Sequence, residues 1–445
     1  MKKKTIYTIT VLILISLFCF MGLSGCADTG EESPGPGESA APQDETPSDA
    51  SATVRFAGFS AGEQYGQTLQ DMLDLFADAY PQITVIDEST GYGDYYAELA
   101  ADIGSGSAPD VFELDCKDII DYMRRDAITP LAGLAASSHT DLGVYQKGLI
   151  DRLCSASYTL MALPFSYSSV VLVYNMDLFD QAGVAYPSTD WLWEDQLLAA
   201  QKITRPEEDI WGYYCEMTDV NQFYTKAVQN DDRFYSGKGK FTLNATNNVE
   251  TLQWLQDLIW VYRVMPTEAE RAGREAADLF AEGKLGMFTA DAGTFADLSE
   301  RCGGIRWGVE VAPGNKRKAT QVSCNVLCIN SATEVSDAAY ALVHFLSSDP
   351  DVQRLRLEAG WDLPPVSGAS VMDAYLEGTP PANKAAVMES TEYALIPQGY
   401  RELELLLNEF LPPYLETVRD NEEIPMDALA AAQAEAERRT GLPQQ

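Results

Sequence analysis

Strands and helices alternate from the start of the folded part of this sequence, and this alternation constrains the fold more than any other feature. The first strand, Val54 to Phe59, is followed by apolar residues at i, i+3, i+4 and i+7 from Leu69, a spacing that predicts a helix ending before Pro81. Alternation of this kind predicts an α/β fold with a parallel sheet and helices on its faces. The predicted order is strand 54–59, helix 69–76, strand 83–86, helix 96–103 and strand 110–114.

The loops after these strands are the first candidates for a ligand site. In open parallel sheets, ligands bind beyond the carboxyl ends of the strands, where the loops diverge and helix N-termini point inward. The loops in question are 60–65, 88–94 and 115–117. The alternative for each loop is a solvated turn without a ligand.

The N-terminus has the layout of an export signal, with Lys2 to Lys4 followed by an apolar run over 6–21. That run is shorter than the roughly 18 residues of a membrane-spanning helix. The next residues, 23–26, read Leu-Ser-Gly-Cys and resemble a bacterial lipoprotein box. The resemblance implies that 1–25 is a signal peptide and that Cys26 is a lipid anchor at the outer face of the cytoplasmic membrane. The alternative is an ordinary cleaved signal with an incidental cysteine.

Composition adds a tether and restricts the partners. Residues 26–52 contain no aromatic residue and no Leu, Ile or Val, so we expect a disordered acidic tether. The chain carries 67 acidic against 31 basic residues, a formal net charge of −36, which argues against nucleic acid and anionic lipid as partners. The remaining body exceeds one comfortable core, so two lobes are expected.

One stretch combines polar and apolar character in a single predicted strand. Residues 164–169 mix hydroxyls and aromatics, whereas 170–174 are continuously apolar, as in a strand buried on both faces. Here the chain resembles the family 1 extracellular solute-binding proteins of ABC importers, the maltose-binding-like group. The matching segments, between about Val54 and Pro365, are YPQITV, GSGSAPDVFELD, LPFSYSSVVLVYNMDLFDQAG, DWLWEDQLLAAQKIT and DLFAEGKLGMF.

The resemblance implies a two-lobe periplasmic-binding-protein-like fold, in which each lobe is a mostly parallel sheet flanked by helices and the ligand cleft lies at the hinge. It places lobe 1 at 53–166 plus 292–350 and lobe 2 at 167–291 plus 351–445. The polar half of the 163–175 stretch then crosses between the lobes. The implied function is capture of a carbohydrate, an oligosaccharide, by a monomeric, membrane-anchored extracellular protein that delivers it to ABC permease subunits, with no cofactor.

Aromatic rings and short polar side chains in the cleft-facing loops are the candidate ligand residues, because a sugar offers C–H faces to rings and hydroxyls to carboxylates and amides. Trp361 lies in AGWDLPPV, a Gly- and Pro-bounded loop, and we expect it to stack on a sugar. The alternative for each candidate is an ordinary core or surface position. The candidates are Tyr65, Asp115, Tyr167, Ser168, Glu216, Asn221, Asp291 and Trp361.

Two departures from the family bear on the ligand. Many relatives carry a Trp where this chain has Gly293, so a stacking ring is absent there unless Phe295 replaces it. The maltose-binding branch carries an acidic residue at the position of Ser168, so a maltodextrin ligand is not supported.

Other functional classes find less support. The chain has 2 His residues, no GxSxG motif and no His pair spaced for zinc, which argues against a triad or zinc hydrolase and against a metal site. A surface glycosidase using a carboxylate pair, and a binder of a non-sugar solute, stay open as alternatives. Cys324 and Cys328 lie on one predicted strand roughly 13 Å apart, too far for a disulfide. Pairing among the other body cysteines is undetermined.

Overall fold

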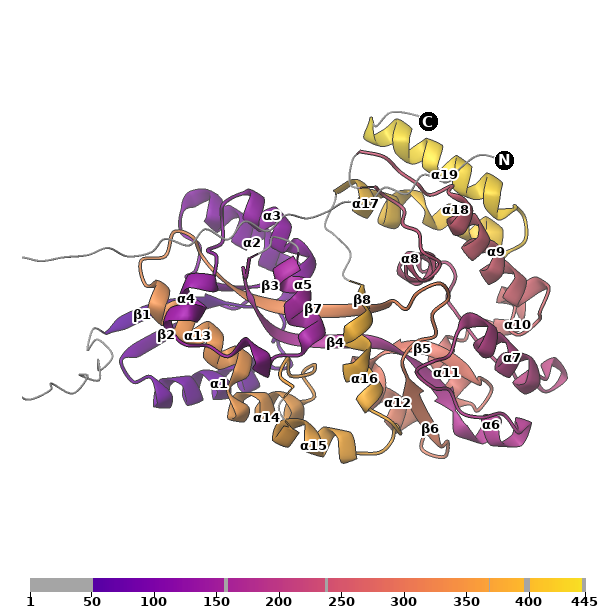
Figure 1. Cartoon of the computed structure of the whole chain (residues 1–445), viewed down its shortest axis with the longest axis horizontal. Helices are drawn as coiled ribbons and strands as arrows, with labels where there is room; N and C mark the ends of the chain where they lie inside the picture. The colour runs from indigo at the N-terminus through magenta and orange to yellow at the C-terminus, as the bar shows by residue number, and fades with distance from the viewer. Residues whose placement is uncertain (1–50, 156–158, 237–238, 368, 396–400, 442–445) are drawn as a thin grey trace, which may run out of the picture. The chain divides into compact units, whose positions relative to one another are not determined.

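The computed structural model describes residues 51–155, 159–236, 239–367, 369–395 and 401–441 (Figure 1). The predicted signal peptide, Cys26 and nearly all of the predicted tether lie outside these residues. The strands are β1 (Ala52–Ala57), β2 (Ile83–Asp87), β3 (Val111–Asp115), β4 (Leu163–Asn175), β5 (Met287–Asp291), β6 (Trp307–Glu310), β7 (Thr320–Ile329) and β8 (Ala394–Leu395).

Helices fill the connections between these strands. Those before β5 are α1 (Gly66–Ala79), α2 (Tyr92–Ser105), α3 (Ile119–Arg124), α4 (Ala132–Ser137), α5 (Lys147–Ser155), α6 (Met176–Ala182), α7 (Trp193–Ile203), α8 (Val220–Gln229), α9 (Thr246–Trp260), α10 (Glu268–Arg271) and α11 (Ala276–Ala281). Those after β5 are α12 (Phe295–Arg301), α13 (Ser336–Ser348), α14 (Pro350–Ala359), α15 (Ala369–Glu377), α16 (Ala385–Glu389), α17 (Arg401–Leu405), α18 (Pro412–Arg419) and α19 (Pro425–Thr440). Short 3₁₀ turns are η1 (Cys116–Asp118), η2 (Leu142–Val144), η3 (Pro206–Glu208), η4 (Ala292–Thr294) and η5 (Ser390–Tyr393), and η6 (Leu406–Phe410) is a π-helical turn.

The strands join in the order β2-β1-β3-β7-β4-β5, with β6 paired to β4 and β8 to β7. The pairs β1–β2 and β1–β3 are parallel, as the strand–helix alternation predicts. β7 runs antiparallel to both β3 and β4.

β4 belongs to two groups of strands, and this is the feature that organises the molecule. Residues 163–169 pair with β7, whereas 170–175 pair with β5 and β6. In Figure 1, β4 and β7 run between the strands β1 to β3 on one side and the strands β5 and β6 on the other. A third segment joins them, because Tyr167 and Leu363 exchange backbone hydrogen bonds of 3.1 and 2.9 Å. The polar-to-apolar stretch of the sequence is therefore one continuous crossing strand.

Side chains alternate across the first group of strands, so that both of its faces are covered. Val54 and Phe56 of β1 pack in one core with apolar residues of α1 and α13. Phe112 and Leu114 of β3 pack in another core with residues of α2 and α3. Because successive side chains of a strand point to opposite faces, this pattern produces a sheet sandwiched between helices.

The second group of strands differs from the expectation of a mostly parallel sheet, because β4 pairs antiparallel with both β5 and β6. Helices α6 to α11 separate β4 from β5 in the chain. Alternation of strands and helices indicates a parallel strand pair only where the helix between two strands brings the chain back to the end of the sheet at which the first strand began. Here the long helical insertion brings β5 in from the opposite end.

None of the helices in the described residues combines the length and apolar character needed to cross a membrane.

Candidate functional site

Ser168 and Asp291 meet where the two groups of strands join. Ser168 lies near the middle of β4, and Asp291 is the last residue of β5. The Ser168 hydroxyl donates a hydrogen bond to Oδ1 of Asp291. The same oxygen accepts from the Gly293 amide at 2.9 Å, so Asp291 also caps η4. A carboxylate held this way keeps its other oxygen available to a ligand donor.

A first cavity of about 220 Å³ lies beside this contact. It combines a carboxylate and hydroxyls with aromatic and aliphatic walls, and Gly293 is among its lining residues. Lys384 is its cationic residue; burial lowers the pKa of Lys384, whose Nζ lies 4.8 Å from the centre of the Tyr375 ring. The lining residues are Ser168, Ala292, Gly293, Phe295, Ala296, Ser299, Leu357, Gly360, Asp362, Leu363, Tyr375, Pro380 and Lys384.

A second cavity of about 300 Å³ lies on the other side of η4 and α12. Phe295 and Ser299 line the first cavity, whereas Thr294, Asp297 and Leu298 line the second, so this segment separates the two. The lining of the second cavity is strongly acidic. Its residues are Tyr214, Glu216, Gln222, Glu275, Ala276, Ala277, Phe288, Thr289, Ala290, Asp291, Thr294, Asp297 and Leu298.

Glu216 is oriented in the second cavity by hydrogen bonds to both of its oxygens. Oε2 accepts from the Tyr214 hydroxyl at 2.6 Å and Oε1 from the Thr218 hydroxyl at 2.6 Å. Burial alone would raise the pKa of Glu216, but the hydrogen bonds from Thr218 and Tyr214 outweigh it and the pKa is lowered. Glu216 is therefore an ionised acceptor.

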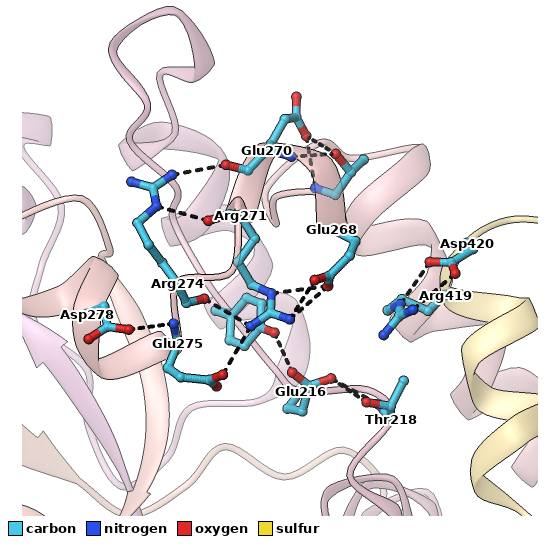
Figure 2. Close-up of polar contacts among 12 residues, drawn as sticks. Glu216, Thr218, Glu268, Glu270, Arg271, Arg274, Glu275, Asp278, Arg419 and Asp420 are labelled. Atoms are coloured by element: carbon cyan, nitrogen blue, oxygen red, sulfur yellow. Dashed lines mark hydrogen bonds and ion pairs between the residues drawn. The ribbon is translucent and has the colours of Figure 1, made fainter.

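Arg271 lies near the Tyr214 ring and forms ion pairs with two other carboxylates. Its guanidinium lies between Glu268 and Glu275 (Figure 2). The N···O separations are 2.8 Å to Glu268 and 3.5 Å to Glu275. Its charged end lies 5.9 Å from the centre of the Tyr214 ring. The charge of Arg271 is thus engaged by two carboxylates and is not presented to a ligand.

Asp362 and Arg356 are two further charged residues near the first cavity. Asp362 accepts from the Ser166 hydroxyl at 3.1 Å, and burial raises its pKa although the Arg356 charge opposes the shift. Arg356 is fully buried, with its guanidinium carbon 4.1 Å from the centre of the Phe165 ring and 4.4 Å from that of Trp361. Burial lowers the pKa of Arg356 to about 10. This buried cation fixes the loop that carries Trp361 and Asp362.

Trp361 lies beneath Tyr65, so the two predicted ligand aromatics contact each other. The Trp361 side chain belongs to the core around α1 and is 2% exposed. A ligand would reach the covered face of Trp361 only if the Tyr65 ring moved. Both residues stay predictions as ligand contacts.

The structure does not bring the remaining candidates to the two cavities. Asp115 ends β3, accepts from the Lys117 amide at 3.0 Å and forms an ion pair with Lys117 Nζ at 3.1 Å. Tyr167 is buried within the strand junction. Asn221 is exposed in the first turn of α8, where its amide donates to Asp219 at 2.9 Å. Ser168, Glu216 and Asp291 are the candidates that line a cavity.

Several cavity residues were missed from the sequence. Asp362 and Tyr214 lie one and two residues from predicted site residues, so adjacency to Trp361 and Glu216 was an available signal. Tyr375 and Lys384 lie beyond the segments that carry the family resemblance. They reach the first cavity because of how the C-terminal part folds, and no pattern in the sequence predicted that these two residues would line a ligand site.

The chemistry available here is hydrogen bonding and ring stacking. Ionised or hydrogen-bonded carboxylates accept from hydroxyl groups, and the Phe295, Tyr375 and Tyr214 rings offer apolar faces. No cluster of three or more His, Cys, Asp or Glu side chains within the described ranges is arranged to hold a metal ion.

Comparison with known families gives one match over most of the chain. Residues 60–353 match the model of the family described as bacterial extracellular solute-binding protein. This range contains strands β2 to β7, which include both crossing strands, and most of the cavity-lining residues.

Individual relatives agree with this match. The arabinooligosaccharide-binding protein of Bacillus subtilis is 24% identical over 262 residues, covering 58% of this chain and 55% of that protein. The sn-glycerol-3-phosphate-binding periplasmic protein of Agrobacterium fabrum is 26% identical over 234 residues, covering 49% and 51%.

A solved structure extends the likeness to the fold. The ABC substrate-binding protein of Listeria monocytogenes, in complex with cycloalternan, is 27% identical with a TM-score of 0.68, covering 88% of this chain and 100% of that chain. The likeness confirms the predicted two-lobe fold class. These relatives are binding proteins, which agrees with the expectation that the chain is not an enzyme.

Proposed function

The chain belongs to the bacterial extracellular solute-binding protein family, and from this premise we propose that it captures an oligosaccharide and delivers it to the permease of an ABC importer. The observation that carries the proposal is the Ser168–Asp291 hydrogen bond. It joins the crossing strand to β5 where each residue lines one of the two cavities. A ligand in these cavities would contact both groups of strands.

The composition of the cavities supports a hydroxyl-rich ligand. Glu216 and Asp291 are carboxylates whose orientation is fixed by protein donors, and such acceptors suit sugar hydroxyls. Phe295 and Tyr375 in the first cavity, and Tyr214 in the second, supply ring faces for the C–H surface of a sugar.

The charge of the second cavity favours a neutral ligand over a phosphate ester. Four carboxylates line it, and none of the described residues in its lining is Lys or Arg. The nearby Arg271 is paired with Glu268 and Glu275. A doubly negative phosphate would meet like charges, which is a general way to reject a wrong ligand. We therefore favour a sugar of the kind named for the Bacillus and Listeria relatives over sn-glycerol-3-phosphate.

The anchoring of the protein is also part of the proposal. The family is extracellular, and the Leu-Ser-Gly-Cys sequence at 23–26 supports acylation of Cys26. Mass spectrometry of the native N-terminal peptide should find an acylated cysteine. An unmodified Cys26, or cleavage at another position, would show that the protein is not anchored through Cys26.

A ligand panel tests the function. Calorimetric titration with arabinotriose, maltotetraose, cycloalternan and sn-glycerol-3-phosphate should give saturable binding of at least one neutral sugar. Chromatography of the same mixtures should recover each sugar intact. If only sn-glycerol-3-phosphate bound, the ligand would be an anionic solute and the proposed sugar ligand would be wrong. If shorter sugars were released, the protein would be a hydrolase and the proposed binding function would be wrong.

A further inference from the structure

We propose that Cys116 and Cys324 form a disulfide bond in an oxidising medium, and that this bond ties η1 to the crossing strand β7. The inference concerns the thiols alone and does not depend on the identity of the ligand. The family is extracellular, and disulfides persist in oxidising extracellular surroundings.

The strand register brings the two cysteines next to its last opposed pair. β3 pairs antiparallel with β7, with Leu114 opposite Val326 and Asp115 opposite Asn325. Cys116, the first residue of η1, and Cys324 on β7 are the residues that adjoin this last pair, one on each segment. Directly opposed residues of an antiparallel pair have Cα atoms about 4.5 to 5.5 Å apart, which is within the range of about 4.4 to 6.8 Å found for disulfides.

The side chains are also in contact. The neighbouring Cys116 side chain and burial both raise the pKa of Cys324, so the two thiols lie close together. Cys324 is buried, whereas Cys116 is partly exposed. The Cys116 thiol is thus accessible to a reagent in solution, whereas the Cys324 thiol lies next to Cys116 in the protein interior.

The remaining described cysteines are not placed to compete. Cys328 is opposite Phe112, and four residues of strand separate it from Cys324 by roughly 13 Å. The Cys215 thiol donates to Gln222 at 3.2 Å, and Cys302 is buried at the end of α12.

The chemistry is a thiol–disulfide exchange with a low-molecular-weight disulfide such as oxidised glutathione. The Cys116 thiolate attacks one sulfur of the reagent, forming a mixed disulfide and releasing one glutathione. The Cys324 thiol then loses its proton and attacks the Cys116 sulfur, releasing the second glutathione. Two protein thiols give up two electrons, which the reagent disulfide accepts.

The bond would restrain a loop near the proposed ligand site. η1 follows Asp115, and Cys324 lies opposite Tyr167 on β4, beside Ser168. If Asp115 contacts the sugar, oxidation also changes affinity, and that consequence alone rests on the proposed function.

Peptide mapping tests the bond directly. Purified full-length protein is reduced, freed of reductant, incubated with oxidised glutathione, alkylated and digested without reduction. The expected result is a linked pair of peptides containing Cys116 and Cys324, lost after dithiothreitol, together with a higher melting temperature that dithiothreitol reverses. A linked pair containing Cys116 and Cys328, two alkylated thiols, or a persistent glutathione adduct on Cys116 would each overturn the proposal.

Variants separate the steps. Cys324→Ser should stop at the glutathione adduct on Cys116, whereas Cys302→Ser should keep the linked pair. If Cys324→Ser fails to fold, Cys116→Ser supplies the same information, because it should leave Cys324 unmodified by the reagent. Modification of Cys324 in the Cys116→Ser protein would show that Cys324 reacts on its own, against the proposed order.

Discussion

The rings of Tyr65 and Trp361 stack with their centroids 5.4 Å apart and their planes 3° from parallel. The Tyr65 hydroxyl also donates to the Gly360 carbonyl oxygen at 3.3 Å. The loop after β1 and the loop after α14 are therefore fastened to each other, and the ring expected to meet a sugar is covered by another ring.

Replacement of Trp361 should first affect stability. Trp361→Ala removes a buried indole between Tyr65, Phe165 and Arg356, so we expect a loss of about 3 to 5 kcal/mol in the free energy of unfolding. Urea denaturation measures the loss, with the 39% exposed Trp260→Ala as the control that should lose much less. An undiminished stability combined with at least tenfold weaker sugar binding would instead assign Trp361 to the ligand.

Removal of a cavity carboxylate should affect binding. Asp291→Asn and Glu216→Gln each replace a charged acceptor by a neutral amide of the same shape, and hydrogen bonds to charged groups are worth about 1.5 to 3 kcal/mol. We expect at least tenfold weaker binding of a sugar that titrates the wild-type protein. Glu334→Gln, at an exposed carboxylate before α13, should bind normally. Unchanged affinity in both cavity variants would exclude these carboxylates from the site.

Asp118 should make the stability fall as the pH rises. Burial and the neighbouring Asp115 raise the pKa of Asp118 to about 6, with Lys117 opposing the shift and Glu404 adding to it. Between about pH 4 and pH 6 the folded state holds a proton that the unfolded state has lost, so the contribution of Asp118 to stability decreases through that window.

Asp118→Asn should remove this decrease. We expect a gain of about 1 kcal/mol at pH 7, less than the full shift because solvent screens a partly exposed carboxyl group. Thermal unfolding at pH 4.5 and pH 7 gives the comparison. A variant whose advantage is equal at both pH values would contradict this assignment.

Lys226 should have the opposite pH dependence. Its Nζ has no hydrogen-bond partner and lies 5.5 and 5.9 Å from the ring centres of Trp193 and Trp254. Burial lowers its pKa to about 8, so between about pH 8 and pH 10 the unfolded state keeps a proton that the folded state has lost. Stability should rise with pH in this window.

Lys226→Met replaces the buried charge by an apolar chain of similar length. We expect about 1 to 3 kcal/mol of stabilisation at pH 7, and a smaller gain at pH 9.5. Urea denaturation at the two pH values measures both. A destabilised variant would show that the attraction between the ammonium group and the Trp rings outweighs the cost of burial.

Ligand binding should close the molecule around the strand junction. The chain crosses between the strand groups at β4, β7 and the Leu363 segment, and hinge closure is an established motion of periplasmic binding proteins. Small-angle scattering should show a smaller radius of gyration with a sugar that titrates the protein. An unchanged radius at saturation would contradict closure.

The sequence by itself determined the order of the elements and the crossing strand. The i, i+3, i+4, i+7 spacing after Leu69 and the polar-to-apolar change over 163–175 are local patterns, and each became a single element, α1 and β4. Local periodicity records which face of an element is buried, so it predicts elements and a fold class without knowing their partners. The motif order was likewise sufficient for the family.

Tertiary structure alone decided which side chains meet. The stacking of Tyr65 on Trp361, the burial of Arg356 between two rings and the contribution of Tyr375 and Lys384 to a cavity join residues far apart in the chain. The antiparallel pairing of β5 with β4 likewise depended on the path that the chain takes through the helices between these two strands. Such contacts follow from the packing of whole elements, and a packed core admits one arrangement of side chains that no local pattern encodes.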